Sequence, residues 1–324
     1  MGVLSKVLVT GGAGFVGSHL VDRLMQQNAF VRVVDNLSSG KEENIKKHLN
    51  KRNFEFLNGD LKDLAVVEKA LIGIETVFHL AANPEVRVDK ADPSIHFQEN
   101  LLATFSLLQT MRKSNSAKLI VFLSSSAVYG EPTELPTSED YGPLLPISVY
   151  GASKLGCEAL VSSYCKTFGF RGLILRLANI VGGRSTHGAI VDFVQKLRYN
   201  PSELEVLGDG TQTKSYLHVE DLVDAVLFAL NDFVDKKKST DVYNVGSLDK
   251  VDVKRIAEIV VEEMRLRNVK LKFTGGVDGG RGWKGDVKTM QLSTRKLTTL
   301  GWKPKHNSEQ AIRKTCKDLL RIFE

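Results

Sequence analysis

The stretch Lys6–Gly17, KVLVTGGAGFVG, decides the fold. It opens with an apolar run of the length of a buried strand, and glycines follow at positions 11, 14 and 17. Glycines at this spacing let the chain turn tightly, let a pyrophosphate approach the backbone, and let the next helix pack close to the strand. That helix, expected to run to about Gln27, would offer its N-terminal amides to phosphates. A spaced glycine motif alone is weak evidence, so its surroundings decide what it means.

Strand and helix patterns alternate through the first half of the chain. We expect strands at 31–34, 54–57, 76–80 and 119–123, with helices at 41–50, 63–71 and 93–112. This alternation predicts an α/β fold built on a doubly wound parallel sheet. Strands at 173–177 and 242–245 should return to that sheet, leaving a smaller C-terminal α/β lobe. We therefore assign 1–179, with 215–245 returning to it, to a nucleotide-binding domain, and 180–214 with 246–324 to a substrate-binding lobe.

Asp35 ends the second strand, eighteen residues after Gly17. A carboxylate at this place can accept both ribose hydroxyls of NAD and would repel the 2′-phosphate of NADP. An ordinary surface aspartate in a turn is the alternative. Arg32 could instead bind the 2′-phosphate of NADP, but it lies within the strand, before Asp35 at the strand end. We therefore expect NAD as the cofactor, bound by residues at the strand ends and turns: Gly11, Gly14, Phe15, Val16, Gly17, Asp35, Asn36, Ser39, Gly40, Asp60, Leu61, Leu80, Ala81 and Ala82.

A second constellation follows the strand at 119–123, where Ser124-Ser125-Ser126 stands at the strand's C-terminal end. Ligands of open α/β sheets bind at such ends. Tyr150 and Lys154 are four residues apart in a helical pattern, so they share one face of that helix. A phenol has an unperturbed pKa of about 10, and a nearby ammonium favours its ionised form. Serine, tyrosine and lysine would together form a proton relay if the strand end and the helix face meet.

The composition sets outer limits on function. The 324 residues carry a formal net charge of +6, with a pI near 9.0, which suits a small polyanionic ligand. The basic residues are scattered among 38 acidic ones, so we expect no nucleic-acid partner. The three cysteines lack metal-ligand spacing, so we expect reduced thiols and no metal. Without a signal-peptide pattern or a membrane-length apolar run, a cytoplasmic location without membrane attachment is expected.

Taken together, the motifs resemble those of the extended short-chain dehydrogenase/reductases, in particular the nucleotide-sugar 4-epimerases with their Rossmann-type sheet. The resemblance covers the whole chain in order and spacing. Its pieces are TGGAGFVG at 10–17, Asp35, HLAA at 79–82, SSSAVYG at 124–130, YGASK at 150–154, RLANIVG at 176–182 and GDGTQTKSYLHVEDL at 208–222.

The resemblance implies that Tyr150 is the catalytic base, that Lys154 binds the nicotinamide ribose, and that Ser125 supplies the catalytic hydroxyl. Related 4,6-dehydratases carry Asp-Glu after that serine and decarboxylases carry a Glu, whereas this chain has Ser126-Ala127. Reversible oxidation at C4 of a UDP-sugar remains, with UDP-glucose and UDP-galactose as the expected pair. The alternatives are a net nucleotide-sugar oxidoreductase, or an epimerase acting on UDP-GlcNAc or UDP-glucuronate.

The same resemblance suggests residues that contact the substrate. Asn179 and Arg281 match diphosphate-binding positions, although Arg281 is followed by extra residues before its glycine. Lys214 stands where related chains usually have Arg, and Lys offers a point charge rather than a fork. Ser126 adjoins the catalytic hydroxyl, and Arg87 could meet a sugar carboxylate, although a solvated Arg is the simpler interpretation. Relatives pair through the helices at 93–112 and 150–168, so we expect a homodimer.

Overall fold

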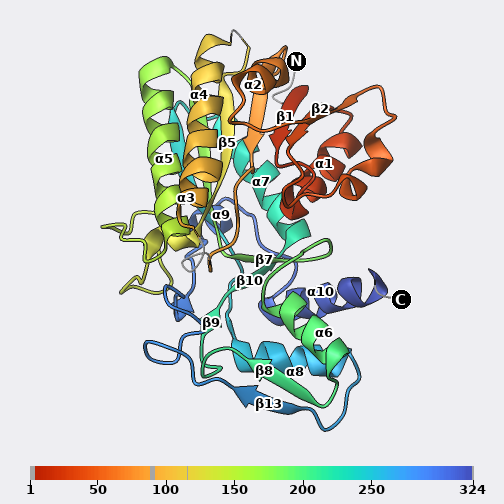
Figure 1. Cartoon of the computed structure of the whole chain (residues 1–324). Coiled ribbons are helices and arrows are strands. Elements are labelled where there is room, and N and C mark those ends of the chain that lie inside the picture. The colour runs from red at the N-terminus through yellow and green to blue at the C-terminus, as the bar shows by residue number, and fades with distance from the viewer. Residues whose placement is uncertain (1–3, 88–91, 115, 323–324) are drawn as a thin grey trace. The chain divides into compact units, whose positions relative to one another are not determined.

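The computed structural model describes residues 4–87, 92–114 and 116–322, and the chain divides into two compact units (Figure 1). The first unit comprises Met1–Val128, Val149–Arg176 and Val226–Tyr243. The second comprises Tyr129–Ser148, Leu177–Ala225 and Asn244–Glu324. Each unit is therefore assembled from segments that lie far apart in the sequence. The assignment of one to the cofactor and the other to the substrate stays a proposal.

A seven-stranded sheet forms the centre of the first unit, with the strand order β11-β6-β5-β4-β1-β2-β3. The pairs of β1 with β2 and β4, of β2 with β3 and of β4 with β5 are parallel, which confirms the doubly wound prediction. The order reverses between β1 and β4, and ligands of such sheets bind where the order reverses. The strands are β1 Lys6–Thr10, β2 Phe30–Asp35, β3 Phe54–Asn58, β4 Thr76–His79, β5 Leu119–Ser125, β6 Arg171–Leu177 and β11 Thr240–Val245.

Helices pack on this sheet through their apolar faces. Helix α1 is Phe15–Gln26, α2 is Leu64–Leu71, α4 is Ala103–Lys113 and α5 is Val149–Phe168. Figure 1 shows α4 and α5 side by side, and buried residues of α2, α4 and α5 share one core with those of the sheet. Both returning strands, β6 and β11, join the sheet beyond β5 as expected.

Two predicted helices differ from the structure. The helix expected over 93–112 is divided into α3 Ser94–His96, a π-helical turn Phe97–Leu102, and α4. The segment expected as a polar helix over 41–50 forms only two short 3₁₀ turns, Glu42–Asn44 and Lys46–His48. Few of its residues are buried, so tertiary packing provides little support for a full helix.

The second unit packs α6 Ala189–Tyr199, α8 Val253–Glu263 and α10 Ser308–Ile322 around its own core. The short helix α9 Arg295–Thr299 was not predicted, and α7 Val219–Val234 contributes to both units. The described strands of the second unit form three small sheets. In two of them a pair of strands lies side by side: β7 Asn179–Val181 with β10 Tyr216–His218, and β8 Glu203–Val206 with β13 Lys270–Phe273. In the third, β9 Thr213–Lys214 lies between β12 Val251–Asp252 and β14 Thr289–Met290. Among the helices of the described ranges, none is both long and apolar enough to cross a membrane.

Candidate active site

The end of β5 and the first turns of α5 bring the three predicted catalytic residues into one region of the first unit. Ser125 is the last residue of β5, while Tyr150 and Lys154 lie on successive turns of α5. The Ser125 hydroxyl accepts a hydrogen bond from the Ala127 amide at 3.2 Å and is itself hydrogen-bonded to the Tyr150 side chain. The condition for a relay, that the strand end meets the helix face, is therefore met by Ser125 and Tyr150.

Burial shapes the acid–base properties of this group. Desolvation raises the pKa of Tyr150 to about 12, although the hydrogen bond from Ser125 opposes that rise. Lys154 is 4% exposed, donates to the Leu123 carbonyl oxygen at 3.0 Å, and lies over the Phe122 ring. Burial lowers the Lys154 pKa. The upward direction at Tyr150 is opposite to that expected from spacing alone, because desolvation of a phenolate outweighs the single hydrogen bond. Ionising this phenol therefore requires positive charge beside it.

Our sequence prediction missed a polar row formed by His96 of α3, Asn100 of the π-helical turn and Thr104 of α4. The His96 ring meets the Tyr150 ring edge-on, with 5.7 Å between centroids. Asn100 donates from Nδ2 to the Ser153 hydroxyl at 2.9 Å, and Ser153 in turn donates to the Tyr150 carbonyl oxygen at 2.8 Å. The available signal was the spacing of His96, Asn100 and Thr104, which places three polar residues on one face of the expected helix; that face is the buried one.

Buried His79 links the glycine turn to this row. Its Nδ1 lies 2.7 Å from the Thr10 hydroxyl, and its Nε2 lies 2.9 Å from the Thr104 hydroxyl. The Thr10 oxygen already accepts the Leu80 and Ala81 amides, so its proton goes to Nδ1, and Nε2 carries the imidazole proton. Burial lowers the His79 pKa to about 3, so the ring is neutral at physiological pH.

The glycine turn is too tightly packed for larger residues. Gly11 has a φ of +69°, and a Cβ there would lie 2.8 Å from the Ala81 amide nitrogen. At Gly17 a Cβ would lie 2.1 Å from the Gly11 carbonyl oxygen. Helix α1 begins after Gly14 with Phe15 and Val16, and its N-cap makes no side-chain hydrogen bond. Its first-turn amides thus match the donors that bind a pyrophosphate.

Asp35 is held at the end of β2 by backbone amides. Its carboxylate accepts hydrogen bonds from the Ala13 amide at 3.0 Å and the Leu37 amide at 2.9 Å. Burial raises its pKa, and these amides partly offset that effect. A carboxylate has about four acceptor sites, so acceptor capacity remains for the ribose. A Cβ at Gly40 would lie 2.8 Å from the carboxylate oxygens, which explains the glycine beside them.

The other predicted cofactor residues lie at neighbouring strand ends of the same unit. Asn36 donates from Nδ2 to Asp60 at 3.1 Å, which joins the ends of β2 and β3. Leu61 is buried, and the predicted stretch Leu80-Ala81-Ala82 follows β4 directly, with the Thr10 hydroxyl accepting its first two amides. Ser39 lies in the turn before Gly40. Arg32 instead donates to Glu55 and to backbone carbonyls at the C-terminal end of α2, so its guanidinium is already paired with other groups.

In the second unit, the predicted diphosphate anchors are already paired. Lys214 donates to Asp286 at 2.5 Å and lies over the Trp283 ring. Arg281 forms an ion pair with Glu131, which raises the Arg281 pKa. Both cations would have to exchange these carboxylates for phosphate oxygens.

Asn179 adjoins the first of these pairs, because its Nδ2 donates to the Ser215 carbonyl oxygen at 3.4 Å, one residue after Lys214. Met290 pairs with Lys214 between β14 and β9 and is buried. The structure therefore groups Asn179, Lys214 and Met290 within the second unit.

Ser126 and Arg87 belong to the first unit. Ser126 begins the 3₁₀ turn Ser126–Tyr129 that follows Ser125. Arg87 is exposed and bonds Glu85 through both its amide and its guanidinium. Among the described residues, no group of three or more His, Cys, Asp or Glu side chains could hold a metal ion.

A model of the NAD dependent epimerase/dehydratase family matches residues 7–246. The chain belongs to this family. It is 33% identical to a UDP-glucose 4-epimerase of Lactobacillus helveticus over 322 residues, which cover 94% of this chain and 93% of that enzyme. It is 34% identical to UDP-glucuronic acid decarboxylase 4 of Arabidopsis thaliana, covering 98% of this chain and 69% of that protein. A crystal structure of UDP-galactose 4-epimerase superposes with a TM-score of 0.87 at 43% identity, covering 98% and 99% of the two chains.

For a member of the NAD dependent epimerase/dehydratase family, the first unit contains the expected cofactor features. The backbone of the Gly11–Gly17 turn can pack this closely only because its glycines lack Cβ atoms, and Asp35 keeps acceptor capacity at the end of β2. The residues present therefore fit NAD, the cofactor that the family's description names.

Proposed function

We propose that the protein interconverts the C4 epimers of a UDP-sugar, with UDP-glucose and UDP-galactose as the first pair. The observation that carries the proposal is the environment of Ser125. Its hydroxyl is bonded to Tyr150, and position 127 supplies a backbone amide to it. Ser126 and Ala127 bring no carboxylate to the place where elimination would need an acid and a base. Ser125 and Tyr150 can therefore transfer one proton to or from an alcohol, as a reversible oxidation at C4 requires.

The chain's own residues provide for that proton. Tyr150, once ionised, takes the C4 hydroxyl proton and later returns it to the C4 oxygen. Ser125 can bond both the phenol and the sugar oxygen, which keeps them aligned. The Lys154 ammonium, fixed by the Leu123 carbonyl, provides positive charge within the same site. Between the two proton transfers, the 4-keto sugar must turn about its phosphate linkage to present its other face.

NAD, when bound, supplies the hydride acceptor and donor for C4 and undergoes no net change over the cycle. The Gly11–Gly17 turn and the first turn of α1 would hold its pyrophosphate, and Asp35 its adenosine ribose. Asn36, Asp60 and the Leu80-Ala81-Ala82 stretch border the same strand ends. Lys154 would meet its nicotinamide ribose.

The substrate diphosphate would be held in the second unit by Asn179, Lys214 and Arg281. Met290 pairs with Lys214 and would limit the sugar's size beside that anchor. Arg87 is already paired with Glu85 through Nε, which offsets part of its charge. A neutral hexose is therefore the first substrate to test, ahead of UDP-glucuronate.

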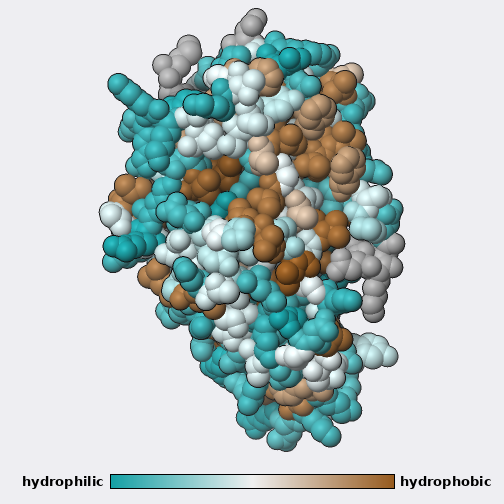
Figure 2. All heavy atoms as spheres, turned by 90° about the vertical axis from the view of Figure 1, so that its left-hand side faces the viewer, coloured by the Kyte–Doolittle hydropathy of each residue, from teal (hydrophilic) through white to brown (hydrophobic). Residues whose placement is uncertain are grey.

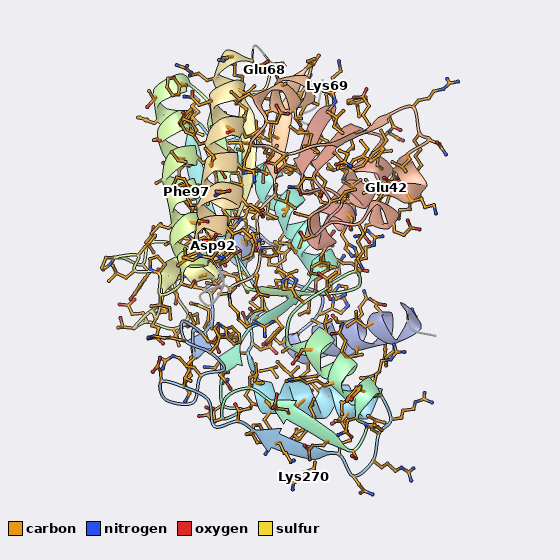
Figure 3. All side chains as sticks on the ribbon, viewed as in Figure 1. Glu42, Glu68, Lys69, Asp92, Phe97 and Lys270 are labelled. Carbon is orange, nitrogen blue, oxygen red and sulfur yellow. The ribbon has the colours of Figure 1, made fainter. Side chains whose placement is uncertain are left out.

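A homodimer is part of the proposal. The first unit exposes Phe97, Leu102, Phe105, Val149 and Phe168 on or beside α4 and α5, with Phe97 57% exposed. Figure 3 labels Phe97 beside α5, and Figure 2 shows apolar patches on this side of the molecule. A second copy seated on α4 and α5 would cover them.

One incubation tests the reaction. The purified protein is mixed with UDP-glucose and substoichiometric NAD⁺, and the sugars are then resolved. We expect UDP-galactose without accumulation of NADH, and Tyr150→Phe should lose on the order of 10²–10⁴-fold in rate while still binding NAD. If no epimer forms from UDP-glucose, UDP-GlcNAc or UDP-glucuronate, the proposal is wrong.

A further inference from the structure

A buried ion pair lies directly behind the proposed catalytic residues and has no role in the reaction described above. Glu158, on α5, and Arg176, near the end of β6, are both about 95% buried. The Arg176 guanidinium donates from Nη2 to Glu158 Oε2 at 2.8 Å and from Nε to both carboxylate oxygens at 3.1 and 3.2 Å. The Ser124 hydroxyl donates to Glu158 Oε1 at 2.5 Å. One carboxylate thus joins β5, α5 and β6.

The position of this carboxylate follows the helical repeat. Glu158 lies four residues after Lys154 and eight after Tyr150, so all three share one face of α5. Lys154 bonds the Leu123 carbonyl and Glu158 bonds the Ser124 hydroxyl, so successive turns of the helix are tied to successive residues of β5. The next residue of that strand is Ser125. The two ties therefore set how far along α5 the end of β5 lies.

Stability alone is a poor explanation for this arrangement. A buried ion pair loses hydration that its attraction often does not recover, and well-packed apolar residues in its place are often as stable or more so. Apolar packing does not fix the direction of a contact. A bidentate arginine–carboxylate contact and a charged hydrogen bond do, because their geometry permits one alignment only.

We propose that Glu158 is a positioning residue: with Arg176 and Ser124 it fixes the end of β5 against α5, so that Ser125 and Lys154 are both held in place for Tyr150. Loss of the contact would let the strand end slide along the helix without unfolding the sheet. Displacements of about 1 Å at a catalytic group can cost on the order of 10²-fold in rate.

Two variants separate this role from folding. Glu158→Gln removes the charge and leaves Arg176 buried without its carboxylate. The double variant Glu158→Leu/Arg176→Met removes both charges of the pair together, so it should melt at or above the wild-type temperature. Asp232→Asn is the control. It disrupts a partly buried charged cluster of the same unit, where Asp232 bonds Tyr243 of β11 and Lys236.

The inference rests on the reaction proposed above, and the readouts are chosen to distinguish the two. The first readout is turnover: we expect kcat to fall on the order of 10- to 100-fold in both Glu158 variants, with KM for the UDP-sugar unchanged. The second is the ionisation of Tyr150, followed by tyrosinate absorbance against Tyr150→Phe in protein loaded with NAD. We expect its midpoint to rise by about one pH unit or more, because Lys154 is no longer held in place. His96 of α3 and Cys157 of α5, which also face this group, are unchanged in every variant.

A protein that is merely destabilised would lose active molecules at all pH values without moving the midpoint. If the double variant keeps wild-type kcat and the wild-type Tyr150 midpoint, or if Asp232→Asn moves the midpoint equally, the inference is wrong. Absence of turnover in the wild type would refute the proposed function instead, and the absorbance titration would still decide the role of Glu158.

Discussion

A single methyl group at Gly17 should weaken NAD binding strongly. In Gly17→Ala the new Cβ would lie 2.1 Å from the Gly11 carbonyl oxygen and 2.8 Å from the Gly12 Cα. The first separation falls about 1.3 Å short of the 3.4 Å at which ordinary contact begins, and both neighbours are backbone atoms that cannot rotate away. Overpacking of this kind costs about 1–3 kcal/mol. If the turn moves to relieve it, NAD affinity falls about 5- to 150-fold.

Calorimetric titration of NAD into the stripped protein measures this effect. The matched control is Gly183→Ala, where a Cβ would meet only the Asp318 side chain at 3.5 Å. We expect the control to bind NAD as the wild type does. Should Gly17→Ala bind NAD within about twofold of the wild type while folding normally, the close approach of helix and strand at this turn has no bearing on the cofactor, and the reasoning is refuted.

Three further predictions concern single side chains. Glu131→Gln should free Arg281 from its ion pair and lower KM for the UDP-sugar by up to about fivefold in steady-state kinetics; an unchanged or higher KM would mean that Arg281 does not reach the diphosphate. His79, with a pKa of about 3 folded and about 6.5 unfolded, favours the folded state fully above pH 6.5 and loses that contribution as the pH falls. Between pH 7 and pH 4.5 the free energy of unfolding of the wild type should therefore fall by about 3 kcal/mol more than that of His79→Gln. An equal fall in both proteins would contradict a buried neutral ring. Asp35→Asn should reduce the preference for NAD over NADP in competition binding, since the repulsion of the 2′-phosphate disappears; an unchanged preference would remove Asp35 from that role.

The sheet was predictable because its determinants are local. The first five strands are mainly apolar, although β2 contains Arg32 and β3 contains Glu55, and the Gly11–Gly17 turn marks the entry into α1. The catalytic group was predictable in part, because Tyr150 and Lys154 are four residues apart and residues at that spacing share one face of a helix. Its acid–base state was not, because the Tyr150 pKa depends on burial by segments far away in the sequence.

Other features depend on contacts that no local pattern encodes. The π-helical turn before α4 carries Asn100, whose partner Ser153 lies 53 residues later on α5. Lys214 and Asp286 are 72 residues apart, and Glu131 and Arg281 are 150 apart. The family resemblance indicated the cations as phosphate anchors, but it could not reveal the carboxylates that already bind them.

The central claim is that a reversible oxidation occurs at C4 of the sugar, with Tyr150 moving the hydroxyl proton. The most direct measurement follows UDP-glucose carrying deuterium at C4 through the reaction with NAD⁺ in ordinary water. The account predicts UDP-galactose with the deuterium retained at C4, none released to solvent, and no conversion by Tyr150→Phe. Deuterium lost to water, or an epimer formed without Tyr150, would contradict it.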